Sequence, residues 1–242
     1  MIGEIRNKQG EKLDYTLHPG AGHDRNIVAI GHGVTGNKDR PFVVALADGL
    51  AQAGITALRF SFSGNGTSEG QFTHSTISKQ VDDLGSVLDH LADWNIGYAG
   101  HSMGGAVGVL RAGRDPRIKL LVSLAGMVHT KAFAEREFGT VKPDEGFMWD
   151  DVACPLSSGY MKDLSTINSV ADKAPDIKVP WLLVHGSEDD VVPIQDSRDI
   201  LGKAGDPAEL VEIPGANHVF DGAHTTPMVD KVVAWVKARF GA

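Results

Sequence analysis

One stretch constrains the fold more than any other, a Gly-x-Ser-x-Gly motif between an apolar run and a helix-like segment. The run covers residues 96–99, and the motif is Gly100-His101-Ser102-Met103-Gly104. A sharp strand-to-helix turn strains its central residue, so the flanking positions need glycine to avoid clashes. This turn lifts the Ser102 hydroxyl above a sheet edge and puts the Met103 N–H at the start of a helix. There the N–H can stabilise negative charge that develops during a reaction at the serine. Because the chain has 29 glycines, chance remains an alternative for the motif taken alone.

Strands and helices alternate along most of the chain. A hairpin is predicted from residues 2–6 and 12–17. Apolar runs typical of strands buried on both faces follow at 26–30, 55–60, 96–99, 119–124, 179–185 and 210–213. Between them, helices are predicted from Pro41 to Gly54 and over 76–91, 196–201 and 228–240. The alternation predicts an α/β fold with a mainly parallel, doubly wound sheet.

One long segment interrupts this alternation. More than fifty residues separate the strands predicted at 119–124 and 179–185, too many for an ordinary crossover. The segment is rich in aromatic and methionine residues, and insertions of this size usually cover a site as a lid. A surface elaboration with its own small core is the alternative. We therefore predict a core from 1–126 and 176–242, with a cap or lid at 127–175.

Two further groups complete a possible catalytic set with Ser102. A serine needs a base to take its proton, and the base needs a third group to orient it. Asp189 follows the strand predicted at 179–185, and His218 follows the one at 210–213. Both lie just past strand carboxyl ends, where open α/β sheets build their sites. All three groups are therefore expected at the same edge of the sheet, in the order Ser, Asp, His.

At this point the chain resembles the α/β-hydrolase family over essentially its whole length. His32-Gly33-Val34 is similar to the family's oxyanion loop, 185–193 to its acid loop, and Gly215-Ala216-Asn217-His218 to its histidine loop. The resemblance implies an eight-stranded, twisted, mainly parallel sheet with helices on both faces. It also implies an oxyanion hole formed by the backbone N–H groups of Val34 and Met103.

Other residues compete for these roles. Glu188 and Asp190 flank Asp189, but the motif spacing favours Asp189. His224 competes with His218 but lacks the Gly-x-x-His setting. His32, His101 and His185 are expected to be structural. The chain's histidines form no close cluster with acidic residues, so no catalytic metal is expected.

These features predict a serine carboxylesterase that hydrolyses small acyl or aromatic esters through an acyl-enzyme, without a cofactor. The insertion more loosely resembles that of bacterial cinnamoyl and feruloyl esterases, which suggests Trp149 and Met127 as substrate contacts. A thioesterase or peptidase would use the same triad. A cofactor-free C–C hydrolase and a non-catalytic hydrolase-fold receptor are further alternatives.

The composition of the chain limits which partners, disulfides and cellular locations are expected. A net charge of −8 argues against nucleic acid or an anionic membrane surface as a partner. The single cysteine, Cys154, allows no intrachain disulfide. Since the first ten residues lack the apolar core of a signal peptide and no apolar run is long enough to span a membrane, a cytoplasmic protein is expected. The oligomeric state is not predicted.

Overall fold

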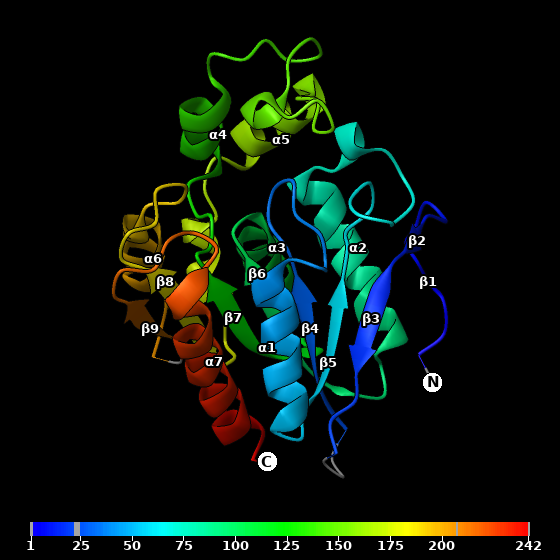
Figure 1. Ribbon diagram of the computed structural model, residues 1–242, viewed down its shortest axis with the longest axis vertical. Helices are drawn as coiled ribbons and strands as arrows, with labels where there is room; N and C mark the ends of the chain where they lie inside the picture. Colours follow the sequence, from blue (N-terminus) through cyan, green and yellow to red (C-terminus); the bar gives the residue numbers. More distant parts are fainter. Residues whose placement is uncertain (1, 22–24, 207, 242) are drawn as a thin grey trace.

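A seven-stranded sheet forms the centre of the molecule in the computed structural model, which describes residues 2–21, 25–206 and 208–241 (Figure 1). Its strands are β3 (Tyr15–His18), β4 (Asn26–Gly31), β5 (Thr56–Phe60), β6 (Asn95–His101), β7 (Ile118–Leu124), β8 (Trp181–Gly186) and β9 (Ala208–Ile213). Their order is β3-β5-β4-β6-β7-β8-β9, and every neighbouring pair is parallel except β3 with β5. Every residue of β4 and of β8 is buried, as expected for strands covered on both faces.

Helices cover both faces of this sheet and create two apolar cores. On one face lie α1 (Pro41–Gln52) and α7 (Thr225–Phe240), in front of the sheet in Figure 1. On the other face lie α2 (Ile77–His90), α3 (Met103–Ala112) and α6 (Ile194–Leu201). Pro41 starts α1 where its missing N–H removes no hydrogen bond, and the hydroxyl of Thr76 caps α2 by accepting from the Lys79 N–H. The predicted helices are confirmed, with small shifts at their ends.

The prediction of eight strands in one sheet is wrong for the described part of the chain. The strand pair β1 (Ile5–Arg6) and β2 (Lys12–Leu13) forms its own two-stranded sheet, and only β3 joins the large one. Asp14 separates β2 from β3 because its backbone binds elsewhere. Its N–H donates to the Ser68 hydroxyl, and its C=O accepts from the Ser61 N–H.

The part of the long segment between β7 and β8 that contains α4 (Thr130–Phe138) and α5 (Ser158–Ile167) lies beyond the carboxyl ends of the parallel strands (Figure 1). The segment also contains η2 (Met148–Asp150) and η3 (Ala171–Asp176); two further short helices, η1 (Phe72–His74) and η4 (Gly222–His224), lie outside it. Phe133, Phe138 and Tyr160 are buried and meet edge to face within this insertion. Within the described ranges, no helix is both long and apolar enough to cross a membrane.

Candidate active site

Ser102 occupies a strained turn between β6 and α3. Its backbone has φ 53° and ψ −117°, and helix α3 begins at the next residue, Met103. A left-handed conformation at a non-glycine residue costs about 1–3 kcal/mol and persists only where neighbours enforce it. Here the Ser102 N–H donates to the Leu124 carbonyl at 2.9 Å, and its carbonyl accepts from the N–H groups of Gly105 and Met127 at 2.9 and 3.0 Å.

The two glycines of the motif are required by close backbone approach, as predicted. A Cβ atom at Gly100 would overlap the Gly104 carbonyl oxygen, and one at Gly104 would lie 2.6 Å from the His32 oxygen. Gly33 belongs to the same tight packing, because a Cβ there would lie 2.7 Å from the Ser102 Cβ. The loop after β4 therefore lies directly against the serine, and only glycine permits this contact.

His218 and Asp189 are hydrogen bonded to each other. The ring Nδ1 of His218 lies 2.8 Å from Asp189 Oδ2. Asp189 follows β8 and His218 follows β9, so the topology brings them together across 29 residues of chain. Both His218 and Ser102 line one cavity. The hydrogen bonds of the described side chains include none between Ser102 and the His218 ring; such contacts are often long before substrate binds.

The competing residues do not share this position. The side chain of Asp189 is fully buried, whereas Glu188 and Asp190 are exposed. His224 lies in η4 and does not line the cavity. The motif spacing that favoured Asp189 and His218 thus agrees with burial and contact.

The Asp189 carboxylate makes four polar contacts. Oδ1 accepts from the backbone N–H groups of Val191 and Val192 at 2.9 and 2.8 Å. Oδ2 faces His218 and, at 3.1 Å, the Nε2 atom of His185. Burial alone would raise the pKa of Asp189, but the hydrogen bonds from His185 and His218 hold that pKa well below its usual range. The carboxylate is therefore negatively charged throughout the physiological pH range.

His185 has a closer connection to the site than the sequence indicates. It is fully buried at the end of β8, and its Nδ1 lies 2.7 Å from the Ser197 hydroxyl of α6. Its Nε2 lies 2.9 Å from the Val192 carbonyl oxygen as well as near Asp189. The expectation that His185 is only structural missed this contact with the carboxylate. The four-residue spacing between His185 and Asp189 is the one signal that could have suggested it.

The loop after β4 is held by a neutral His32. Its Nδ1 lies 2.9 Å from the Gly33 carbonyl, and its Nε2 accepts from the Phe62 N–H at 3.1 Å. This pattern requires the proton on Nδ1. Burial lowers the pKa of His32 to about 4, so the ring stays uncharged near neutrality. The same loop presents Val34 to the cavity and holds Thr35 at φ 52°.

His101 packs against the back of His218. Its Nε2–H donates to the His218 carbonyl at 2.9 Å, and its ring lies between Phe42 and the His218 ring, with both centroid distances 4.6 Å. Burial, followed by repulsion from His218, lowers the pKa of His101 well below its ordinary value. A neutral ring here fixes the His218 loop without adding charge to the site.

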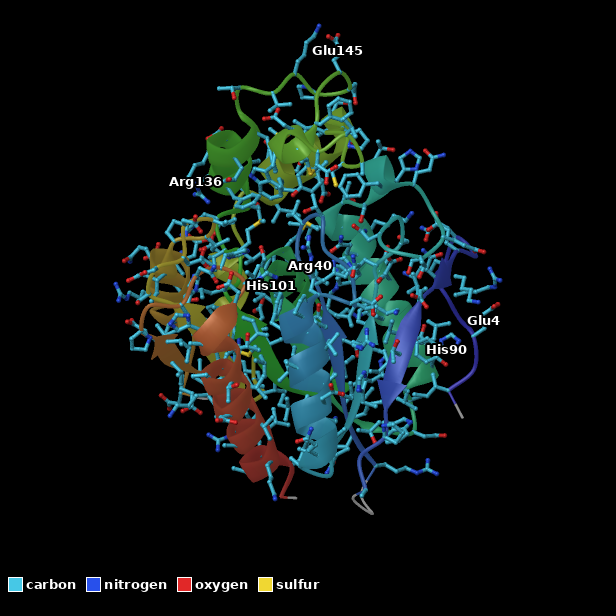
Figure 2. All side chains as sticks on the ribbon, viewed as in Figure 1. Glu4, Arg40, His90, His101, Arg136 and Glu145 are labelled. Carbon is cyan, nitrogen blue, oxygen red and sulfur yellow. The ribbon has the colours of Figure 1, made fainter. Side chains whose placement is uncertain are left out.

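The cavity beside Ser102 has a volume of about 320 Å³, at the small end of the range for small-molecule sites. It lies between the sheet and the insertion, where Figure 2 labels two of its residues, Arg40 and His101. The lining residues are His32, Gly33, Val34, Thr35, Gly36, Arg40, Phe42, His101, Ser102, Trp149, Val191, His218 and Val219. Arg40, Phe42, Val191 and Val219 were not predicted, because no motif marks them.

The two expected substrate contacts lie in different places. Trp149 lines the cavity, is 44% exposed, and its indole N–H donates to Glu137 at 3.1 Å. Met127 does not line this cavity. It is buried beside Trp181 in the core beneath the site, so we do not include it among the proposed substrate contacts.

Comparisons with known proteins agree with this architecture. The profile of the family described as serine aminopeptidase, S33, matches residues 22–143 and 156–220. Est1E from Butyrivibrio proteoclasticus, solved with ferulic acid bound, superposes with a TM-score of 0.89 and 26% identity over 99% of this chain and 100% of Est1E. The uncharacterized protein YfhR of Salmonella typhimurium is 27% identical over 97% of this chain and 80% of its own length.

A third relative supports the fold. Alpha/beta hydrolase domain-containing protein 10 from mouse has a TM-score of 0.81 at 18% identity, over 98% of both chains. Its human counterpart, named palmitoyl-protein thioesterase ABHD10, is 24% identical over 66% of this chain and 56% of its own length. The expected α/β-hydrolase fold is confirmed.

Proposed function

The chain belongs to the serine aminopeptidase S33 family and has the α/β-hydrolase fold, and from this premise we propose that it is a serine carboxylesterase for small acyl or aromatic esters. The observation that carries the proposal is the Asp189–His218 pair, whose histidine lines the same cavity as Ser102 on its strained turn. Binding alone requires neither a strained serine nor a buried, ionised carboxylate behind a histidine. Both are what nucleophilic catalysis requires.

In the proposed first step, Ser102 Oγ attacks the ester carbonyl carbon while His218 takes the hydroxyl proton through Nε2. Asp189 holds the other ring nitrogen, Nδ1, at 2.8 Å. This bond selects the tautomer whose Nε2 is free to accept a proton. It also stabilises the imidazolium that forms as the tetrahedral intermediate develops.

Backbone donors stabilise the oxyanion in this proposal. Met103 is the first residue of α3, so its N–H has no acceptor within the helix and lies at the positive end of the helix dipole. Val34 borders the cavity from the loop that packs against Ser102. Loss of one such donor typically lowers the rate by about 10²–10³-fold.

The remaining steps complete a two-stage hydrolysis. His218 returns its proton to the leaving alcohol oxygen as the C–O bond breaks, which leaves an acyl group on Ser102. Water, deprotonated by His218, then attacks the acyl carbonyl and regenerates the free serine. Each stage uses the same base and the same oxyanion site, so the chemistry requires no cofactor.

The size of the cavity and the residues that line it favour small, partly aromatic esters as substrates. Phe42 and Trp149 contribute aromatic surface, and Val191 and Val219 contribute aliphatic surface. Est1E, which binds ferulic acid in its crystal structure, is similar over the full length of the chain. We propose that residues 127–175 act as a cap and that Trp149 contacts the substrate's apolar group.

A panel of substrates tests the proposal against its alternatives. We expect wild-type protein to hydrolyse p-nitrophenyl acetate and butyrate faster than the octanoate, to hydrolyse methyl ferulate, and to lose all of these activities in Ser102→Ala. Matched thioester and aminoacyl amide substrates identify a thioesterase or a peptidase if either is turned over faster. A folded protein without activity on any ester contradicts the proposal and favours C–C hydrolysis or a receptor.

A further inference from the structure

Arg40 introduces a positive charge into a cavity that is otherwise without fixed charge. It directly precedes α1 and is one of the thirteen residues that line the cavity, none of which is aspartate or glutamate. The lining histidines His32 and His101 are neutral, since burial lowers the pKa of each. This contrasts with the whole chain, which has 31 acidic and 23 basic residues.

The guanidinium of Arg40 has spare hydrogen-bond donors. One terminal nitrogen donates to the Thr35 carbonyl at 3.1 Å. Among the residues that the structure describes, the other N–H groups of Arg40 have no acceptor, and no carboxylate lies within ion-pair distance. Arg111 and Arg198, in contrast, each bind a carboxylate, those of Asp115 and Glu212.

Arg40 shares the cavity with residues of the core and of the insertion. Val34 and Thr35 line it from the loop after β4, and Trp149 lines it from the insertion. After burial, the positive charge of Arg40 also contributes to lowering the pKa of His32 in the same loop. A substrate held between the two walls would therefore lie beside the guanidinium.

We propose that Arg40 binds a carboxylate on the substrate, remote from the scissile bond, so that the preferred ester is an anionic one. The inference rests on the proposed esterase function and names its substrate class. A guanidinium binds a carboxylate through two parallel N–H···O bonds, and Arg40 has free donors for them. The positive charge also attracts anionic ligands toward a cavity in a protein whose net charge is negative.

Pairs of substrates that differ only in charge test the proposal. On the acyl side we compare p-nitrophenyl hydrogen adipate with p-nitrophenyl methyl adipate, and on the alcohol side p-acetoxybenzoate with its methyl ester. The measured quantity is the ratio of kcat/KM for the anionic ester to that for the neutral ester. The pair with the larger ratio identifies the side of the scissile bond that faces Arg40.

We expect this ratio in one pair to fall about 2- to 10-fold in Arg40→Gln, the range expected for a charge-assisted hydrogen bond from an exposed guanidinium. Arg40→Lys keeps the charge and should retain part of the preference. In wild-type protein the same ratio should fall as salt is raised, because salt screens the attraction. This last measurement needs no variant to fold.

Arg25→Gln is the matched control, since it removes the same charge at an exposed site before β4, at the opposite end of the strand from the cavity. It should leave the ratio unchanged. Equal slowing of both esters in Arg40→Gln, at constant ratio, would overturn the proposal and assign Arg40 a role in holding Thr35. Turnover of the neutral ester by Ser102→Ala would instead contradict the esterase mechanism, independently of Arg40.

Discussion

His185 is predicted to position the Asp189 carboxylate, and two substitutions separate this role from simple packing. The ring of His185 contacts the Ser197 hydroxyl through Nδ1 and both Val192 and Asp189 through Nε2. The amide of His185→Asn reaches about as far as Nδ1 and can keep the contact with Ser197. The longer amide of His185→Gln reaches about as far as Nε2 and can keep a donor to Asp189.

The expected magnitudes follow from the bonds that each variant loses. His185→Asn loses a hydrogen bond to an ionised carboxylate and leaves the buried Val192 carbonyl without its donor, so the free energy of unfolding should fall by about 2–4 kcal/mol. With Oδ2 of Asp189 held by His218 alone, the carboxylate orients the catalytic ring less firmly. We expect kcat to fall about tenfold, equivalent to about 1.4 kcal/mol, with little change in KM.

Urea unfolding and steady-state hydrolysis of p-nitrophenyl butyrate measure the two effects separately. His185→Gln should lose stability to a similar degree, because its bond to Ser197 is lost, yet keep a kcat within about threefold of wild type, a difference of about 0.7 kcal/mol. A wild-type kcat in folded His185→Asn would refute the positioning role. Equal kcat losses in the two variants would assign the effect to packing.

Three further predictions follow from the same geometry. In Gly100→Ala the new methyl overlaps the Gly104 carbonyl, so urea unfolding should show a loss of at least about 1–3 kcal/mol, whereas Gly159→Ala, in an open helical position, should be neutral or stabilising. The pKa of His32 is about 4 in the folded state and about 6.5 in the unfolded chain, so the unfolded chain binds more protons between these two pH values. The free energy of unfolding should therefore fall by about 3 kcal/mol as the pH drops from about 6.5 to 4. Urea titrations that give a constant free energy of unfolding across this range would contradict the prediction. Trp149→Ala should lower kcat/KM for p-nitrophenyl ferulate about 2- to 10-fold but leave p-nitrophenyl acetate nearly unchanged; equal losses on both esters would contradict substrate contact.

The parts of this site that were predictable depend on short-range patterns and parallel topology. Gly100 and Gly104 mark the turn because no other residue permits that backbone approach. Asp189 and His218 follow strands whose carboxyl ends share one edge with β6. Chain order and strand direction were therefore enough to predict that the three groups lie near one another.

The unpredicted parts depend on how loops fold against one another. Arg40 lines the cavity because its loop folds back over Ser102, and the hydrophobic pattern of the sequence does not predict that turn. His185 contacts Asp189 because Ser197, on the following helix, orients its ring. The first strands differ from expectation because Asp14 binds side-chain and backbone groups of a distant loop, a pairing that local alternation does not reveal.

The identity of the nucleophile is the central claim, and covalent labelling tests it most directly. Folded protein is treated with an alkyl fluorophosphonate, and the adduct is located by peptide mass spectrometry. We expect one adduct per chain, on Ser102, with loss of ester hydrolysis in proportion to labelling and no adduct in Ser102→Ala. An adduct on another residue that accompanies loss of activity, or full ester hydrolysis by the Ser102→Ala protein, would contradict this claim.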